Sequence, residues 1–269
     1  MGQLRDVKKV RVHHLAQAKR AGERIAMLTA YDAPTAAIFD AAGTDVLLVG
    51  DSMGNAVLGY ETTLPVALED CLRATRAVAS AAKRALVVSD LPFGTYEASA
   101  AQAFESAAKL VKAGAQAVKL EGGRRVAAQI QLLAESGVPV MAHLGFTPQS
   151  VNALGGNRVQ GRDDAAAEAL RLDALAVQRA GAFALVLELV PAELAASVSA
   201  LLAIPTIGIG AGAATDGQVL VWTDMAGMGD WAPSFARRFG EIGAALRAAA
   251  LAYGDAVRDG SYPDAGHSF

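Results

Sequence analysis

The segment VLLVGDSMGN, residues 46–55, shows the pattern that repeats along the chain. An uninterrupted apolar run stops at Gly50, and an acid and a hydroxyl, Asp51 and Ser52, follow at once. Apolar runs of this kind are typical of strands buried on both faces, as in a parallel sheet covered by helices. Gly50 and Gly54 on either side of the acid would let another group approach the backbone closely.

Seven further apolar runs fit the same description. The predicted strands are residues 25–30, 46–50, 85–90, 117–121, 139–144, 184–189, 205–210 and 218–222. Helical periodicity rich in alanine fills most of the intervals, at residues 34–43, 65–83, 99–114, 125–137, 165–181 and 191–203. Four of these helices end in a glycine that suits a left-handed C-cap, namely Gly43, Gly114, Gly137 and Gly181.

Eight strands with crossover helices predict an α/β fold, a single closed (β/α)8 TIM barrel that forms one catalytic domain over residues 1–269. A doubly wound open sheet is the alternative, but the strand count and the lack of a GxGxxG motif after the first strand favour the barrel. The interval after the seventh strand suits only a short or irregular helix. We also expect an N-terminal helical extension within the first twenty residues and a C-terminal helix over roughly residues 233–258.

Composition narrows the possible partners and location. The formal net charge is −3, so no basic patch predicts binding to nucleic acid or to an anionic membrane. No apolar run is long enough to predict a membrane span, and the basic N-terminus lacks the apolar region of a secretory signal. The single cysteine, Cys71, cannot form a disulfide within the chain and suits a packed residue better than a nucleophile. These features predict a cytoplasmic protein.

Ionisable residues recur where the predicted strands end, which is where barrel enzymes carry their chemistry. A single acid at such a place is more often a helix N-cap or a solvated loop residue, but a whole series is hard to explain in that way. The first strand is followed by Tyr31-Asp32, and the seventh ends in the glycine-rich IGIGAG. The ionisable residues at the other strand ends are Asp51, Asp90, Lys119, Glu121, His143 and Glu188.

Three of these acids, Asp51, Asp90 and Glu121, would converge on one point above the barrel rim. Carboxylates so close repel one another, and a divalent cation relieves that repulsion. Ligands that are all oxygen favour Mg²⁺ over zinc. Such a cation can chelate a 2-oxo acid and stabilise its enolate as a Lewis acid.

Three other residues have roles that the pattern leaves partly open. Lys119 shares the barrel-facing side with Glu121 and could pair with substrate oxygens, although a Schiff-base lysine is a competing interpretation. His143 could donate a hydrogen bond to the substrate or be a buried structural histidine. Glu188 lies in the apolar strand LVLEL and is the candidate general base.

Long ordered blocks of the sequence resemble the ketopantoate hydroxymethyltransferase (3-methyl-2-oxobutanoate hydroxymethyltransferase) family, and the similarity runs from about residue 8 to the end. The blocks are YDAPTAAIFDAAGTDVLLVGDSMGNAVLGYETTLPV, VVSDLPFGTYE, AVKLEGG, VMAHLGFTPQSVNALGG, IPTIGIGAG, DGQVLVWTDMAG and the terminal HSF. Two positions depart from the usual pattern: Thr215 stands where many members have cysteine, and Gly266 replaces the usual acid before HSF.

The resemblance implies transfer of a hydroxymethyl group from 5,10-methylenetetrahydrofolate to 3-methyl-2-oxobutanoate, which gives 2-dehydropantoate in pantothenate and coenzyme A biosynthesis. It also implies a Mg²⁺-dependent, cytoplasmic TIM barrel that is commonly a homodecamer. Glu188 would be the catalytic proton acceptor. By the same resemblance the metal ligands would be Asp51, Asp90 and Glu121, and the substrate contacts Asp51, Ser52, Asp90, Lys119 and His143.

Two other functions stay open on the residues alone. One is a Mg²⁺-dependent carbon–carbon bond lyase or mutase of the phosphoenolpyruvate mutase and isocitrate lyase kind, which also acts on 2-oxo acids. Such enzymes carry a cysteine in a lid loop, and Cys71 lies instead in a predicted helix. The other is a non-catalytic barrel, which the complete set of acids disfavours. The polar, glycine-rich segment 145–162 is the candidate lid.

Overall fold

The computed structural model describes residues 4–269, so the first three residues of the predicted N-terminal extension lie outside the described residues. The chain divides into two compact units, one ending at Leu220 and the other beginning at Val221. The prediction of a single catalytic domain over residues 1–269 therefore stays a prediction for the chain as a whole.

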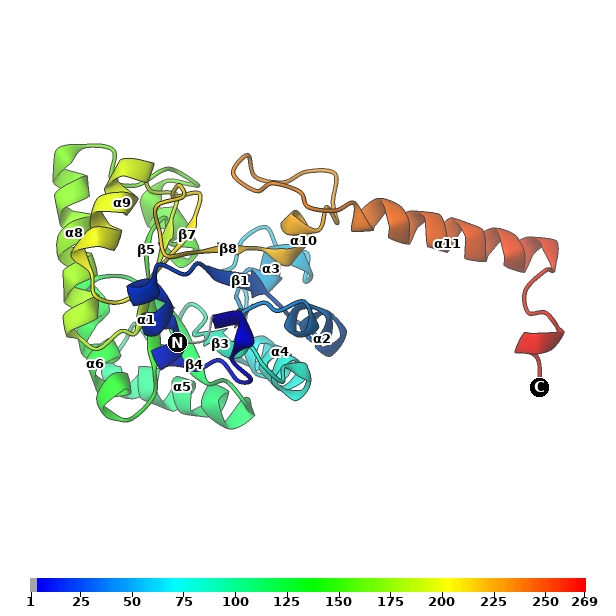
Figure 1. The fold of residues 1–269 in the computed structure, drawn as a ribbon, viewed down its shortest axis with the longest axis horizontal. Helices are drawn as coiled ribbons and strands as arrows, with labels where there is room; N and C mark the ends of the chain where they lie inside the picture. The colour runs from blue at the N-terminus through cyan, green and yellow to red at the C-terminus, as the bar shows by residue number, and fades with distance from the viewer. Residues whose placement is uncertain (1–3) are drawn as a thin grey trace. The chain divides into compact units, whose positions relative to one another are not determined.

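The first unit is a closed barrel of eight parallel strands, in which β8 pairs with β1 (Figure 1). The predicted TIM barrel is confirmed, and each predicted strand begins and ends within two residues of the observed strand. The strands are β1 Ile25–Thr29, β2 Val46–Val49, β3 Leu86–Asp90, β4 Ala117–Glu121, β5 Val140–Gly145, β6 Ala184–Glu188, β7 Thr206–Ile209 and β8 Gly217–Leu220.

Helices surround the strands in the same alternation that the sequence predicts (Figure 1). The predicted glycine caps are confirmed, because the four glycines that follow α2, α5, α6 and α8 all have positive φ. The interval between β7 and β8 contains no helix. The barrel helices are α1 Val12–Ala21, α2 Ala33–Ala41, α3 Met53–Ala56, α4 Leu68–Ala81, α5 Ala100–Ala113, α6 Ala127–Glu135, α7 Val151–Leu154, α8 Asp164–Arg179 and α9 Ala192–Leu201, with short 3-10 turns at Leu4–Asp6, Arg124–Val126 and Pro148–Ser150.

Cys71 lies on α4 and is completely buried. Burial raises the pKa of its thiol well above the usual range, and the negative charges of Asp90 and Asp51 act in the same direction. A buried thiol that holds its proton is a poor nucleophile, so the interpretation of Cys71 as a packed residue is confirmed.

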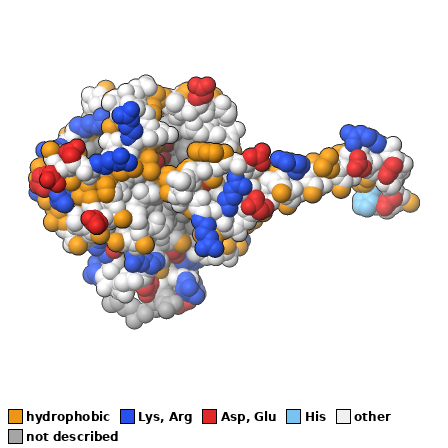
Figure 2. All heavy atoms as spheres, turned by 90° about the horizontal axis from the view of Figure 1, so that it is seen from above, with side chains coloured by type: hydrophobic (Ala, Val, Ile, Leu, Met, Phe, Trp, Pro, Cys, Tyr) orange, Lys and Arg blue, Asp and Glu red, His pale blue; other side chains and the backbone are white. Residues whose placement is uncertain are grey.

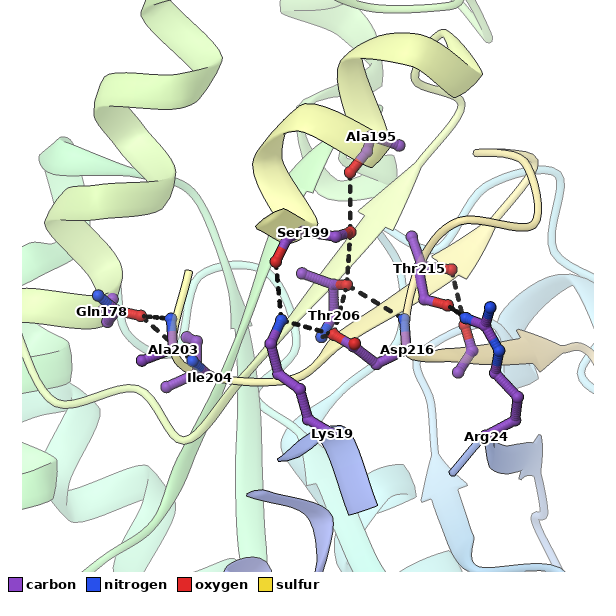
Figure 3. Close-up of polar contacts among 11 residues, drawn as sticks. Lys19, Arg24, Gln178, Ala195, Ser199, Ala203, Ile204, Thr206, Thr215 and Asp216 are labelled. Atoms are coloured by element: carbon purple, nitrogen blue, oxygen red, sulfur yellow. Dashed lines mark hydrogen bonds and ion pairs between the residues drawn. The ribbon is translucent and has the colours of Figure 1, made fainter. Parts of the chain in front are cut away.

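A polar cluster joins α1 to the segments that lead into β7 and β8 (Figure 3). Asp216 Oδ2 accepts hydrogen bonds from the backbone N–H and hydroxyl of Thr206, at 2.8 and 2.9 Å, and pairs with Lys19 Nζ at 2.8 Å. Lys19 also donates to the carbonyl of Ser199 at 2.8 Å. The carboxylate ties together the two strands that no helix connects, at the end of the barrel where those strands begin.

The second unit contains α10 Trp222–Met225, α11 Ile242–Asp259 and a 3-10 turn at Ala265–His267. The predicted C-terminal helix is confirmed, but its predicted start near residue 233 is wrong. The preceding residues fold back on the end of α10, where Phe239 N–H donates to the Met225 carbonyl at 2.8 Å and Ile242 N–H to the Ala226 carbonyl at 3.0 Å. These bonds hold the chain away from a helical path until Ile242.

Helix α11 has no buried residue, and apolar side chains stand among charged ones along it (Figure 2). Its exposed large apolar side chains are Ile242, Leu246, Leu251, Tyr253 and Val257. Among the described residues, no helix is long and apolar enough to cross a membrane.

Candidate active site

The register of the barrel brings the predicted site residues together in pairs. Asp90 at the end of β3 stands opposite Lys119 on β4, and Glu121 on β4 stands opposite His143 on β5. The side chains of these four residues are almost completely buried. Residues two apart on a strand point to the same side, so Lys119 and Glu121 both face the barrel interior.

Asp51 and Asp90 form the first half of the cluster. The backbone N–H of Asp51 donates to Asp90 Oδ2 at 3.0 Å, and Lys119 Nζ forms an ion pair with Asp90 Oδ1 at 2.9 Å. Burial raises the pKa of Asp51 to about 8, with the charges of Asp90 and Glu121 adding to the effect. Burial alone would lower the pKa of Lys119, but the three surrounding carboxylates outweigh it and raise that pKa.

His143 forms the second half, between two carboxylates. Its Nδ1 lies 3.3 Å from Glu121 Oε1 and its Nε2 lies 3.3 Å from Glu188 Oε2. Burial and Lys119 would lower the pKa of this histidine, but Glu121 and Glu188 outweigh them and raise it to about 9. The protonated ring thus links the buried acid of β4 to Glu188 of β6, whose side chain is 17% exposed.

The cluster has the donor set for a divalent cation. It contains four carboxyl groups but two cationic side chains, Lys119 and His143, so the acids outnumber the cations. Unneutralised oxygen donors of this kind fit a hard cation such as Mg²⁺. Among the described residues, no three His, Cys, Asp or Glu side chains already stand in metal-ligand positions. The fit therefore rests on donor chemistry and charge.

Tyr31, Tyr96 and Gln149 also reach the site, and the sequence alone assigned them no role. Tyr31 OH and Ser52 Oγ lie 2.9 Å apart, so the predicted substrate contact Ser52 has a buried phenol beside it. Gln149 contacts two of the carboxylates and Tyr96. Gln149 lies inside the segment predicted to be a lid, but it is buried, so the start of that segment is fixed to the site.

The backbone of Glu188 is held by a glycine on the neighbouring strand. A Cβ on Gly145 would lie 2.2 Å from the carbonyl oxygen of Glu188, and Gly145 has a φ of 95°. Phe146 N–H donates to that same carbonyl at 2.8 Å. The next residue, Leu189, has a φ of 47°, a conformation that a leucine rarely adopts. Close packing therefore fixes the place of Glu188.

Replacing Gly145 by alanine should destabilise the protein by several kcal/mol, because the methyl group would collide with the Glu188 carbonyl and φ is unfavourable for alanine. Gly156→Ala is the matched control: its φ of 99° is similar, but a Cβ there would meet nothing within 4 Å. We expect the control to lose only about 1–2 kcal/mol. Chemical denaturation of the two variants measures the difference. Equal losses would show that the contact with Glu188 is not a tight one.

A family model described as ketopantoate hydroxymethyltransferase matches residues 9–265. The chain belongs to the ketopantoate hydroxymethyltransferase family. The resemblance expected from the sequence is thereby confirmed, and with it the prediction that the protein is an enzyme.

Curated relatives of this ketopantoate hydroxymethyltransferase family member are similar to it in sequence over almost its full length. A 3-methyl-2-oxobutanoate hydroxymethyltransferase from Acidothermus cellulolyticus is 60% identical over 264 residues, which cover 97% of both chains. One from Rhodococcus jostii is 58% identical, over 97% of this chain and 91% of the relative.

Among solved structures, the family member resembles a phosphonopyruvate hydrolase in complex with oxalate and Mg²⁺, with a TM-score of 0.58 and 14% identity over 96% of this chain and 93% of that one. It also resembles 2,3-dimethylmalate lyase, a member of the PEP mutase/isocitrate lyase superfamily, with a TM-score of 0.58 and 17% identity over 97% and 89% of the two chains. At sequence identities this low, the structural similarity shows a shared fold and nothing more.

Thr215, one of the two departures from the family pattern, has a structural role. It is fully buried, its hydroxyl donates to the Gly217 carbonyl at 2.9 Å, and it accepts a hydrogen bond from Gln218 Nε2 at 2.9 Å. These contacts close the turn into β8. Gly266 lies in the second unit, where its N–H donates to Asp264 Oδ1 at 2.9 Å.

Proposed function

We propose that the protein transfers a hydroxymethyl group from 5,10-methylenetetrahydrofolate to 3-methyl-2-oxobutanoate and so makes 2-dehydropantoate, a step of pantothenate biosynthesis. The observation that carries the proposal is the buried cluster at the strand ends, in which three carboxylates and Lys119 adjoin a fourth carboxylate, Glu188, across His143. The names of the relatives support the choice of substrate.

The proposed cofactor is Mg²⁺, which Asp51, Asp90 and Glu121 would hold. When bound, the cation supplies Lewis acidity toward the substrate oxygens. The Mg²⁺ named with the phosphonopyruvate hydrolase structure is in keeping with this assignment, since that barrel shares the fold.

The other residues have roles that follow from their charge and place. Lys119, whose raised pKa keeps it cationic, would stabilise negative charge that develops on the substrate. Ser52, beside Tyr31, would donate to the substrate carboxylate. Glu188 would accept the proton from C3, because it is the least buried acid of the cluster and can face a ligand. His143 would contact the substrate while holding Glu188 in place.

Proton NMR of 3-methyl-2-oxobutanoate in D₂O tests this function directly. With enzyme and Mg²⁺, the C3 proton signal should disappear by exchange, and addition of methylenetetrahydrofolate should then yield dehydropantoate. Exchange without transfer would keep the deprotonation site but contradict the hydroxymethyl transfer. Folded protein that catalyses no exchange, with or without folate, would contradict the proposed function altogether.

A lyase or mutase of the phosphoenolpyruvate mutase and isocitrate lyase kind is the alternative that shares the fold. The single cysteine of this chain is buried on α4, so it cannot serve as the lid cysteine of such an enzyme. This observation supports the hydroxymethyltransferase assignment.

The remaining proposals concern assembly and location. We propose a cytoplasmic homo-oligomer, a decamer by resemblance to the family. The apolar side chains of α11 that its own unit leaves exposed support self-association, because packing them against a second copy would stabilise the helix. Light scattering of the purified chain gives its mass, and a monomer at micromolar concentration would contradict the proposal.

A further inference from the structure

Gln149 lies on the 3-10 turn Pro148–Ser150 that follows β5, and it is only 5% exposed. Its side-chain Nε2 donates to Asp51 Oδ2 at 2.8 Å, and its backbone N–H donates to Glu121 Oε2 at 3.0 Å. One residue therefore binds one oxygen of each of two carboxylates, of which one follows β2 and the other ends β4.

The orientation of the Gln149 amide is fixed by its neighbours. Nε2 also donates to the carbonyl of Leu91 at 3.0 Å, and Oε1 accepts from Tyr96 OH at 2.7 Å. The Leu91 carbonyl can only accept a hydrogen bond, so a flipped amide would place its oxygen against that acceptor. The NH₂ group must therefore face Asp51.

Tyr96 holds the amide from the other side. Its ring is among the largest fully buried side chains, and its hydroxyl also lies 3.2 Å from both the backbone nitrogen and the carbonyl oxygen of Glu121. Tyr96 thus fixes Gln149 and the end of β4 together.

Gln149 holds one oxygen of each carboxylate. Its bonds go to Asp51 Oδ2 and Glu121 Oε2, while the other oxygen of Glu121, Oε1, lies 3.3 Å from His143 Nδ1. Groups that orient metal-binding side chains in this way usually set the affinity of the metal site, although they do not touch the metal.

We propose that Gln149 is a positioning residue that sets Asp51 and Glu121 for a divalent cation, and that Tyr96 locks the Gln149 amide in the orientation this requires. The inference rests on the proposed function, because the cation belongs to that proposal. Gln149 acts through the two carboxylates and needs no contact with the substrate.

Binding of Mn²⁺ to the full-length protein, measured from the EPR signal of the free ion, tests the proposal without turnover. Gln149→Leu keeps a similar volume but removes the amide, and it should raise the Kd for Mn²⁺ by about 10–100-fold. Tyr96→Phe removes a single oxygen and should raise the Kd by a smaller factor, roughly several-fold. Wild-type affinity in folded Gln149→Leu would overturn the proposal. Should that variant fail to fold, wild-type affinity in Tyr96→Phe would overturn it instead.

Gln129→Leu is the matched control. Gln129 is equally buried, at 6% exposure, and its amide donates only to the carbonyls of Tyr96 and Glu97. This variant should lose stability in the metal-free state much as Gln149→Leu does, yet bind Mn²⁺ as the wild type does. An equal loss of Mn²⁺ affinity in the control would overturn the proposal, because general loosening of the fold would then explain both. A wild-type protein that binds no Mn²⁺ would overturn the metal assignment itself, which distinguishes the two failures.

Discussion

A Glu188→Gln variant should lose turnover by about a hundredfold to ten-thousandfold while still binding 3-methyl-2-oxobutanoate, because the amide has a similar shape but cannot accept the C3 proton. The packing of the Glu188 backbone against Gly145 does not depend on the side chain, so the end of β6 should keep its place. Its contact with His143 Nε2 can persist through the amide oxygen.

Loss of C3 deuterium exchange, with an unchanged Kd for the 2-oxo acid from calorimetry, would support this role. Glu193→Gln is a suitable control, since Glu193 is an exposed acid in the first turn of α9, the next helix along the chain. It should exchange and turn over like the wild type. Deuterium exchange retained in Glu188→Gln would rule out this residue as the base.

An Asp51→Asn variant should separate activity from stability. Turnover should fall by about a hundredfold or more, because one of the three proposed cation ligands loses its charge. The metal-free protein should nevertheless become more stable at pH 8 than the wild type, by an amount on the order of a few kcal/mol. The reason is that Asp51 is buried beside Asp90 and Glu121, and the neutral amide removes that repulsion.

The sign of the pH dependence follows from the raised pKa. The pKa of Asp51 is about 8 in the folded protein, so Asp51 keeps its proton up to that pH, whereas an unfolded chain releases it near the ordinary aspartate pKa of 3.8. The folded state therefore binds more protons in this window, and rising pH costs the wild type stability. Denaturation in the presence of EDTA at pH 5 and pH 8 should show the advantage of Asp51→Asn growing with pH. An advantage that is absent, or that shrinks as pH rises, would contradict this account of the cluster.

Much of the barrel could be predicted because its signals are local. Apolar runs that end in glycine or acid mark the strands, and helical periodicity marks the segments between them, so the boundaries agree closely with the structure. The acids at the strand ends were found for the same reason. The start of α11 could not be predicted, because it depends on hydrogen bonds to the end of α10 that no local sequence pattern reveals.

Gln149 and Tyr96, the side chains that hold the site carboxylates in place, could not be predicted from local patterns. Gln149 stands in a polar, glycine-rich segment that is typical of a mobile loop, and Tyr96 follows a turn. Only the folded barrel brings the two together beside Asp51, whose position in the sequence lies 98 residues from Gln149. The one available signal was the resemblance itself, since FTPQS belongs to a matching block.

The thiol of Cys71 can report how often the protein opens locally around α4. It is the only thiol in the chain, it is fully buried on α4 beside β3, and its raised pKa keeps it in the unreactive form. A thiol reagent can therefore label the chain only when α4 separates from the barrel, and the labelling rate counts such events. Because the same helix lies behind the strand that ends in Asp90, a cation that tightens the site should slow this labelling.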